Sequence, residues 1–229
     1  MTRRLITGAG SGIGAAIAHV LHARGDELVL LARNEERAGE LAATYAGAQT
    51  LVSDLTDPTS VLRLAVPDTL DTVLHVAGAV DLAPVAEVAA ERLREQIDVN
   101  LVAPVLLTQV CLPALRRAQG LVVFVNSGAG LVANPTWGAY AASKFGLRAV
   151  ADALRAEELE NGVRVTTVFP SRTATPMQEK VHQQEGRDYD AAAWMRPETV
   201  ADTIRHVIDL PAGTTIPEVT MRQQVPPRT

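Results

Sequence analysis

The sequence has almost no cysteine: Cys111 is the single one among 229 residues. An intramolecular disulfide is therefore excluded, and so is a metal site built from several cysteines. Of the five histidines, His19 and His22 alone are three residues apart, and the expected helix that carries them has no Asp, Glu or Cys to complete a ligand set. We therefore expect no bound metal.

The chain also lacks an excess of positive charge and long apolar runs. The net charge is -5, which argues against a protein that binds nucleic acid. No apolar run approaches the roughly 20 residues of a membrane span. The N-terminus lacks the apolar region and cleavage site of a signal peptide. We expect a cytoplasmic protein with no membrane partner.

The remaining composition is that of an ordinary folded domain. Hydrophobic residues make up 47% and charged residues 21% of the chain, which excludes disorder. A chain of this length forms one or two domains. Because no linker or break in composition is visible, we expect a single domain over residues 1–229.

Short apolar runs alternate with helical segments along the whole chain. Continuous runs of Val, Leu and Ile between helices are typical of parallel strands buried on both faces. Repeated β-α-β units predict an α/β fold of the Rossmann type, a doubly wound and mostly parallel sheet of about seven strands with helices on both faces. The expected strands are 3–6, 27–31, 50–52, 72–76, 121–126, 164–169 and 215–220, and the expected helices are 14–24, 35–45, 91–117, 137–160 and 197–210.

One segment, from Thr173 to Met195, shows no clear periodicity. It is rich in Gln, Glu, Asp and His, and it follows the end of an expected strand. Irregular segments at that place usually cover binding sites. We expect a substrate lid over 173–195.

A cluster of glycines connects the first expected strand to the first helix, in Thr7-Gly8-Ala9-Gly10-Ser11-Gly12-Ile13-Gly14. Glycines permit positive φ and let backbone N–H groups approach a pyrophosphate. The N-terminus of the helix adds partial positive charge. The position favours a dinucleotide site over a plain turn, which the glycines alone leave open.

The second expected strand ends in Ala32 followed by Arg33. In a Rossmann site this end meets the adenosine ribose, where an Asp or Glu would accept from the 2′-hydroxyl of NAD. A guanidinium instead favours a 2′-phosphate. We predict NADP(H) as the cofactor, with further contacts from Arg37 or Ser11. The alternative leaves Arg33 as a solvated surface charge.

Tyr140 and Lys144 lie on one face of an expected helix, because residues about four apart are neighbours there. A nearby cation favours the phenolate. Lowering the pKa of Tyr140 from about 10 to about 7 requires roughly 4 kcal/mol, which we expect Lys144 and an oxidised nicotinamide to supply. Taken alone, this Tyr–Lys spacing is a weak motif.

Several motifs in order give the chain a resemblance to the short-chain dehydrogenase/reductase (SDR) family, in its compact single-domain branch. They are the glycine loop, Ser53-Asp54-Leu55, Asp98-Val99-Asn100-Leu101, Ser127, and Tyr140 to Lys144. Together they cover nearly the whole chain. The resemblance implies an oxidoreductase that interconverts a carbonyl and an alcohol by hydride transfer, for which the end of the second expected strand predicts NADP(H) as the cofactor.

The resemblance also implies roles for single residues. Tyr140 would be the general acid/base, and Lys144 would bind the nicotinamide ribose and lower the pKa of Tyr140. Ser127 would hydrogen-bond the substrate oxygen, and Asn100 would hold a water in a proton relay. The residues expected at the cofactor are Gly8, Ser11, Gly12, Ile13, Gly14, Arg33, Asp54, Leu55, Ala77, Gly78, Tyr140, Lys144, Pro170, Thr173 and Thr175. Turn or capping roles stay open for Ser127, Asn100 and Asp54.

Two short stretches depart from the family pattern. Where the family has Asn-Asn-Ala-Gly, this chain has His75-Val76-Ala77-Gly78. Other partners must therefore hold the backbone there, and we expect a structural role for His75. Ser171 stands where the family has glycine after Pro170, which is tolerated if its φ is negative.

The substrate itself is not specified by the sequence. We expect its pocket between 80–86, 129–137 and the lid, and the apolar side chains there favour a small apolar carbonyl compound; they are Leu131, Val132, Trp137, Met177 and Trp194. Glu179, Lys180 and Arg187 leave a polar acid as the alternative.

Two other functions occur with the same fold: nucleotide sensing, and epimerase or dehydratase chemistry. A protein that only senses the nucleotide usually loses the Tyr or Lys, and an epimerase or dehydratase generally needs a longer C-terminal region. The helices 91–117 and 137–160 pair across a dimer in the family, so we expect a homodimer or homotetramer.

Overall fold

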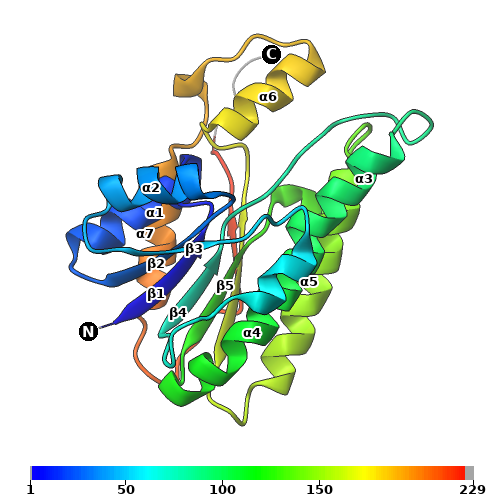
Figure 1. The fold of residues 1–229 in the computed structure, drawn as a ribbon. Helices are drawn as coiled ribbons and strands as arrows, with labels where there is room; N and C mark the ends of the chain where they lie inside the picture. Colours follow the sequence, from blue (N-terminus) through cyan, green and yellow to red (C-terminus); the bar gives the residue numbers. More distant parts are fainter. Residues whose placement is uncertain (1, 225–229) are drawn as a thin grey trace.

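A computed structural model describes residues 2–224, which form a parallel sheet between two layers of helices (Figure 1). The sheet has seven strands in the order β3-β2-β1-β4-β5-β6-β7, and every neighbouring pair is parallel. The predicted doubly wound α/β fold is confirmed. The strands are β1 (Arg3–Thr7), β2 (Glu27–Ala32), β3 (Gln49–Val52), β4 (Thr72–His75), β5 (Leu121–Val125), β6 (Arg164–Pro170) and β7 (Glu218–Met221).

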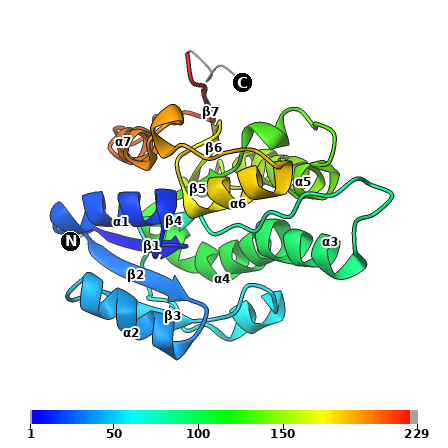
Figure 2. The same cartoon turned by 90° about the horizontal axis from the view of Figure 1, so that it is seen from above.

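The helices divide between the two faces of the sheet (Figure 2). One face is covered by α1 (Gly12–Ala23), α2 (Glu35–Thr44) and α7 (Pro197–Ile208). The other is covered by α4 (Ala103–Ala118) and α5 (Gly138–Glu157). The strand order reverses between β1 and β4, since the chain first winds outward through β2 and β3. In such sheets ligands bind outside the carboxyl ends of the strands at this reversal.

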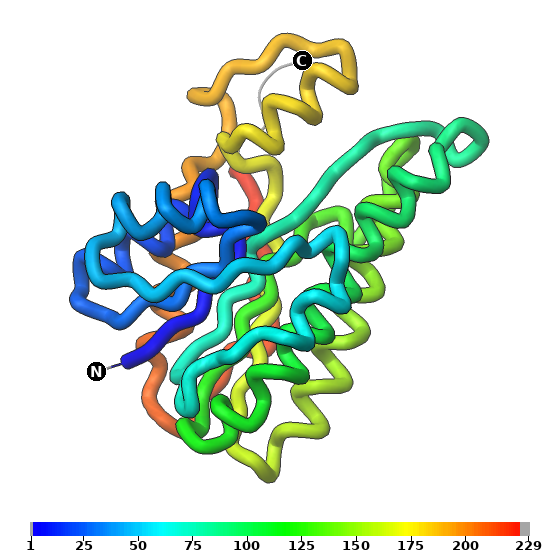
Figure 3. The backbone as a smooth tube through the Cα atoms, viewed as in Figure 1, coloured from blue at the N-terminus to red at the C-terminus, as the bar shows by residue number. Residues whose placement is uncertain are grey.

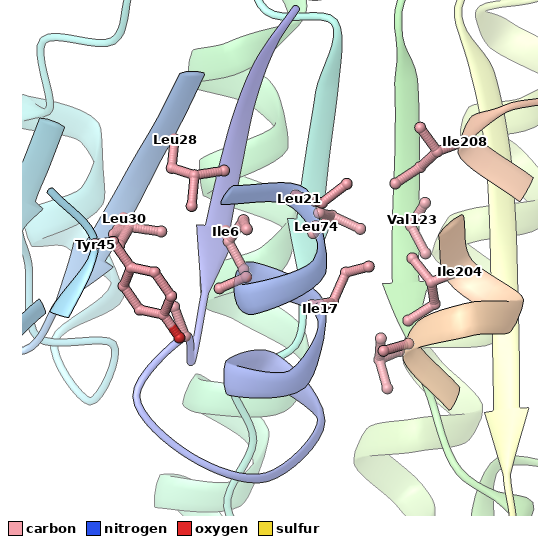
Figure 4. Close-up of a cluster of buried hydrophobic side chains, with 14 of the residues drawn as sticks. Ile6, Ile17, Leu21, Leu28, Leu30, Tyr45, Leu74, Val123, Ile204 and Ile208 are labelled. Carbon is pink, nitrogen blue, oxygen red and sulfur yellow. The ribbon is translucent and has the colours of Figure 1, made fainter. Parts of the chain in front are cut away.

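Alternation along the strands creates two buried clusters. Leu5 packs against the helices of one face and Ile6 against those of the other, because successive side chains of a strand point to opposite faces. Figure 4 shows the cluster on the α1 side, with Ile17 of α1 near Leu74 of β4 and Ile204 of α7 on the facing helix. This packing fixes α1, and with it the glycine loop, against the sheet.

The helical stretch before β5 has the expected length, Ala90–Ala118 against the expected 91–117, but is more apolar than expected. α3 (Ala90–Ile97) continues through a π-helical turn, Asp98–Val102, into α4. Among the described residues this stretch, Ala90–Ala118, alone is long enough to cross a membrane and contains an 18-residue window with a sufficient mean hydropathy, 1.6. The expectation that no segment approaches that length is therefore wrong. Leu107, Cys111 and Leu115 pack beneath the sheet, so the apolar composition serves the core.

The expected irregular lid contains a helix, α6 (Pro176–Glu185), and a short 3-10 turn, Ala191–Ala193. Thr175 caps α6 by accepting from the N–H of Gln178, and Gly186 ends it with a φ of 66°. Few residues of α6 are buried, which explains why no apolar periodicity marks it. Figure 3 shows this yellow-to-gold segment folding back on itself beyond the ends of the strands.

The packing of α1 yields a stability prediction. Ile17 is fully buried in the cluster of Figure 4, so Ile17→Ala should lower the free energy of unfolding by about 2–5 kcal/mol through lost burial and a cavity. Urea denaturation measures this, with His19→Ala on the exposed side of α1 as the control, expected within about 0.5 kcal/mol of the wild type. A loss below about 1 kcal/mol for Ile17→Ala would contradict the packing.

Candidate active site

The glycine loop lies at the carboxyl end of β1 and approaches the loop after β4 closely. Gly8 has a φ of +73°, and a Cβ on it would lie 2.9 Å from the backbone N of Ala77. A Cβ on Gly14 would lie 2.0 Å from the carbonyl oxygen of Gly8. Both positions require glycine for the space as well as, in Gly8, for the dihedral angle. The glycine loop therefore packs backbone against backbone, at a distance that side chains would prevent.

The start of α1 presents its backbone N–H groups at this loop. Ser11 is the N-cap residue, but its side chain makes no capping hydrogen bond, and the first turn of α1 contains no acidic residue. Open N–H groups at a helix N-terminus bind anionic groups such as a pyrophosphate. A dinucleotide fits this cradle.

The backbone after β4 lacks the asparagine pair of the family, and Thr7 provides the hydrogen-bond acceptor for it. Its Oγ1 accepts hydrogen bonds from the backbone N–H groups of Val76 and Ala77, both at 3.0 Å. His75 is buried and stacked on Phe124, with ring centroids 4.8 Å apart, and its Nε2 lies 2.8 Å from Thr108 Oγ1. Burial lowers the pKa of His75 to about 3. His75 is a neutral packing residue, the structural role that we expected.

Three predicted residues come together where β5 ends and α5 begins. Ser127 follows β5, while Tyr140 and Lys144 lie one turn apart on α5 and are both buried. Ser127 Oγ accepts from the N–H of Ala129 at 3.1 Å, which shows the capping contact left open for it, and both Ser127 and Tyr140 line the same cavity. Lys144 Nζ donates to the carbonyl oxygen of Val125 at 3.1 Å and lies 5.8 Å from the centre of the Tyr140 ring.

Burial controls the acidity of this group. It raises the pKa of Tyr140 to about 12, and the hydrogen bond with Ser127 opposes the rise. It lowers the pKa of Lys144 to about 8. The expectation that Lys144 lowers the pKa of Tyr140 is not met by the protein alone, since desolvation of the phenol outweighs a cation beside its ring. At neutral pH Tyr140 therefore carries its proton.

Asn100 lies in the π-helical turn, an irregularity that often occurs at functional sites. Its Oδ1 accepts from the N–H of Ala79 at 2.8 Å, and its Nδ2 donates to Ala79 O and to Ser143 Oγ at 2.8 and 3.0 Å. The side chain thus links the loop after β4 to α5. The role of holding a water stays a prediction.

Asn126 is a functional residue that the sequence analysis missed. Its Oδ1 accepts from the N–H of Ser127 at 2.8 Å, and its Nδ2 donates to the carbonyl oxygen of Lys144 at 2.9 Å. A Cβ on Gly130 would lie 2.3 Å from the same Oδ1. One buried amide therefore sets Ser127 against α5. A polar residue at the end of the apolar run 121–125 was the available signal.

One cavity of about 920 Å³ joins the glycine loop to the Tyr140 group. It is lined by most of the predicted site residues, namely Gly8, Ser11, Gly12, Ile13, Gly14, Ala77, Gly78, Ser127, Tyr140, Lys144, Pro170, Thr173 and Thr175. The cavity also extends along 80–84, 134–137 and the lid, close to the predicted substrate pocket. Leu131, Val132 and Trp194 do not line it.

Four predicted site residues do not line this cavity: Arg33, Asp54, Leu55 and Asn100. Asp54 Oδ1 accepts from the N–H of Thr56 at 2.9 Å, which matches the turn role left open for it. Leu55 packs on the second core cluster, and Arg33 is exposed. Their cofactor contacts stay predictions.

Ser171, in place of the family's glycine, carries no backbone strain. In the described part of the chain, the residues other than glycine with positive φ are Gln119 and Thr136. The N–H of Ser171 donates to the carbonyl oxygen of Met221 at 2.9 Å, which extends the pairing of β6 with β7. A serine is therefore accommodated after Pro170.

Comparison with known proteins agrees with this geometry. A family model described as short chain dehydrogenase matches residues 3–186. The chain belongs to the short-chain dehydrogenase/reductase family. It is accordingly an oxidoreductase of SDR type, a family that uses a nicotinamide cofactor and acts on small molecules.

Relatives in the SDR family extend over nearly the whole chain. An uncharacterised oxidoreductase of Staphylococcus epidermidis is 30% identical over 225 residues, with 95% of each chain covered. An alcohol dehydrogenase of Thermococcus sibiricus matches with a TM-score of 0.81 and 26% identity, covering 97% of this chain and 96% of that one. A protein assigned as an NAD(P)-dependent gluconate 5-dehydrogenase of Beutenbergia cavernae has a TM-score of 0.82 and 28% identity, with 96% and 94% covered.

The buried ammonium of this SDR site predicts a pH-dependent stability. The pKa of Lys144 falls from 10.5 to about 8 on folding, so the charged side chain is a burden to the folded state below pH 8. As pH rises from about 8 to about 10.5, the unfolded chain binds more protons than the folded one and the wild type gains stability. Lys144→Met should therefore be more stable than the wild type at pH 7, by roughly 1–3 kcal/mol, and this difference should shrink above pH 8.

Urea denaturation of the cofactor-free protein at several pH values tests this. Arg63→Met, at an exposed position of the 3-10 turn Pro58–Arg63, is the control and should stay within about 0.5 kcal/mol of the wild type. A constant difference between Lys144→Met and the wild type from pH 7 to pH 10.5 would contradict the assignment.

Proposed function

We propose that the chain is an NADP(H)-dependent oxidoreductase that interconverts a carbonyl and an alcohol, with Tyr140 as the acid/base. The observation that carries the proposal is a single cavity lined by the glycine cradle at one end and by Ser127, Tyr140 and Lys144 at the other. The cradle supports binding of a dinucleotide, and the hydroxyl pair supports proton transfer beside it.

In this proposal the bound nicotinamide supplies or accepts the hydride. The Tyr140 hydroxyl donates its proton to the substrate oxygen during reduction, and the Ser127 hydroxyl donates a hydrogen bond to the same oxygen. Donors placed where charge develops stabilise the transition state. Asn126 holds the backbone of Ser127 in position. Lys144, with a pKa of about 8, is largely protonated at neutral pH and stabilises the phenolate that remains.

The preference for NADP(H) rests on two arginines near the glycine loop. β2 ends in Ala32 and Arg33, without an acidic residue for the ribose. Arg37 Nη2 donates to the carbonyl oxygen of Gly10 at 2.6 Å, so its guanidinium lies against the loop. The Thermococcus sibiricus relative is described with 5-hydroxy-NADP and the Beutenbergia cavernae relative with NADP, which supports the same choice here.

A homodimer or homotetramer in the cytoplasm also belongs to the proposal. Leu93 of α3 and Phe145 of α5 are exposed, and α3 packs against α5. Apolar side chains exposed on neighbouring helices support an interface there.

Tyr140→Phe tests the catalytic part of the proposal. Loss of the phenolic proton should reduce kcat by about a hundredfold or more, since general acid catalysis contributes at least that factor. The affinity for NADPH should stay nearly unchanged. The measurement is oxidation of NADPH, followed by absorbance, with a panel of ketones and aldehydes, together with a separate titration of NADPH. Retained turnover would refute the role of Tyr140, and tight NADPH binding without any turnover in the wild type would favour the nucleotide-sensing alternative.

The cofactor preference is tested with Arg33→Ala and Arg37→Ala. Each variant should weaken NADPH binding by about tenfold or more, because a charge-assisted contact with the 2′-phosphate is lost, and should leave NADH binding unchanged. Calorimetric titration measures both affinities. Arg63→Ala, at an exposed position on the 3-10 turn after Pro58, is the control. Equal affinities of the wild type for NADPH and NADH would reject the preference.

A further inference from the structure

The lid end of the cavity carries charged groups that the proposed reaction does not use. Around the substrate space the lining is largely apolar, with Val80, Leu82, Trp137, Met177 and Val181. At the lid end it includes Arg172, Glu185 and Arg187. Two guanidinium groups and one carboxylate leave an excess of one positive charge there.

Arg172 is held rigidly at this place. Its guanidinium carbon lies 5.6 Å from the centre of the Trp137 ring and 5.5 Å from the centre of the Trp194 ring. Two indoles therefore contact the same guanidinium group, an arrangement that is attractive and fixes its plane. A pre-ordered arginine loses less entropy on binding a ligand than a free one.

Glu185 occupies only part of this guanidinium group. Arg172 Nη1 and Nη2 donate to the two carboxylate oxygens of Glu185 at 2.8 and 2.5 Å. Within residues 2–224, Nε of Arg172 has no hydrogen-bond partner, and the side chain keeps 29% of its surface exposed. The Nε–H group of Arg172 is therefore available to a ligand, and the ion pair with Glu185 already orients the guanidinium group.

This group lies close to the reacting end of the cavity. The rings of Trp137 and Tyr140 are 5.8 Å apart, so a single indole separates the phenol from the Arg172 guanidinium. A small molecule whose carbonyl carbon meets Tyr140 and Ser127 would reach Arg172 with a chain of a few atoms along Trp137.

We propose that Arg172 determines substrate specificity by binding a carboxylate through its free Nε–H edge, and that the substrate is an oxo acid or hydroxy acid with a short apolar chain between the two groups. A carboxylate matches the single excess positive charge better than a dianionic phosphate does. A planar carboxylate also suits a planar edge of N–H donors. This inference rests on the proposed function and specifies its substrate class.

Levulinate, its two homologues with longer chains, and the methyl esters of all three are suitable probes. At least one acid should be reduced with a kcat/KM about tenfold or more above that of its ester, the factor expected for a charge-assisted contact. Arg172→Met should remove this preference by lowering kcat/KM for the acid while leaving that for the ester nearly unchanged. Arg63→Met is the matched control, because Arg63 is an exposed arginine that does not line the main cavity; it should leave the ratio of acid to ester unchanged.

Binding can be measured without turnover, because Trp137 and Trp194 are the only two tryptophans of the chain. The acids should change the tryptophan fluorescence of the NADP-bound protein saturably, with half-saturation at about tenfold or more lower concentration than the esters. Glu185→Gln removes the carboxylate that binds Nη1 and Nη2 of Arg172 and that repels the carboxylate of the ligand. The variant should therefore bind the acids more tightly, by about threefold or more. A residue that merely fastened the lid would not give opposite effects in Arg172→Met and Glu185→Gln.

The outcomes separate this inference from the proposed function. Turnover of the neutral esters with no preference for any acid, and no saturable fluorescence change, would overturn the carboxylate site and leave the oxidoreductase proposal standing. Saturable acid binding that Arg172→Met weakens, without turnover of any compound, would keep the carboxylate site and refute the proposed reaction.

Discussion

The hydroxyl of Thr7 holds together the two strands between which the whole site opens. β1 and β4 are neighbours at the point where the strand order reverses, and beyond their last paired residues the Thr7 oxygen takes two backbone N–H groups of the chain leaving β4. This brings Ala77 so near Gly8 that no Cβ fits between them. A bare backbone surface results, with the start of α1 beside it. The dinucleotide cradle thus depends on one side-chain acceptor at the end of a buried strand.

Beside this cradle, two ionisable side chains lie in a buried environment. Tyr140 and Lys144 are buried, and burial moves the pKa of each toward its neutral form. Such groups reduce stability unless they are hydrogen-bonded; Lys144 has the carbonyl oxygen of Val125 as its partner, and Ser127 lowers the pKa of Tyr140 against the effect of burial. The extensive apolar packing on both faces of the sheet supplies the stability that lets this small polar group persist, as expected where activity and stability conflict.

The sequence was sufficient for the fold and for most residues that line the cavity. Apolar runs located the central strands well, because parallel strands buried on both faces are apolar throughout. The edge strands β3 and β7 are only partly buried and contain polar residues, so their bounds were less exact. The sequence could not identify Thr7 and Asn126 as the residues that hold the backbone, since their bonds join segments far apart in the chain. It also missed α6, whose mostly solvated residues give no periodic signal. The raised pKa of Tyr140 was unforeseeable for a similar reason, because desolvation depends on how the folded chain surrounds the phenol.

The lid connects recognition of the substrate to the ordered core. Arg172 follows β6 directly, Trp137 precedes α5, and Glu185 ends α6, so the ion pair and its two indoles join three separate elements around one opening. On the opposite side of α6, Lys180 donates to Val80 and Gln184 Oε1 accepts from Leu82 N. Side chains therefore hold α6 at both walls of the cleft, while a backbone bridge between Thr173 and Met195 joins the two ends of the lid. Side-chain contacts form and break more easily than strand pairing, which allows a ligand to enter while its charged end meets Arg172 beside the indole of Trp137.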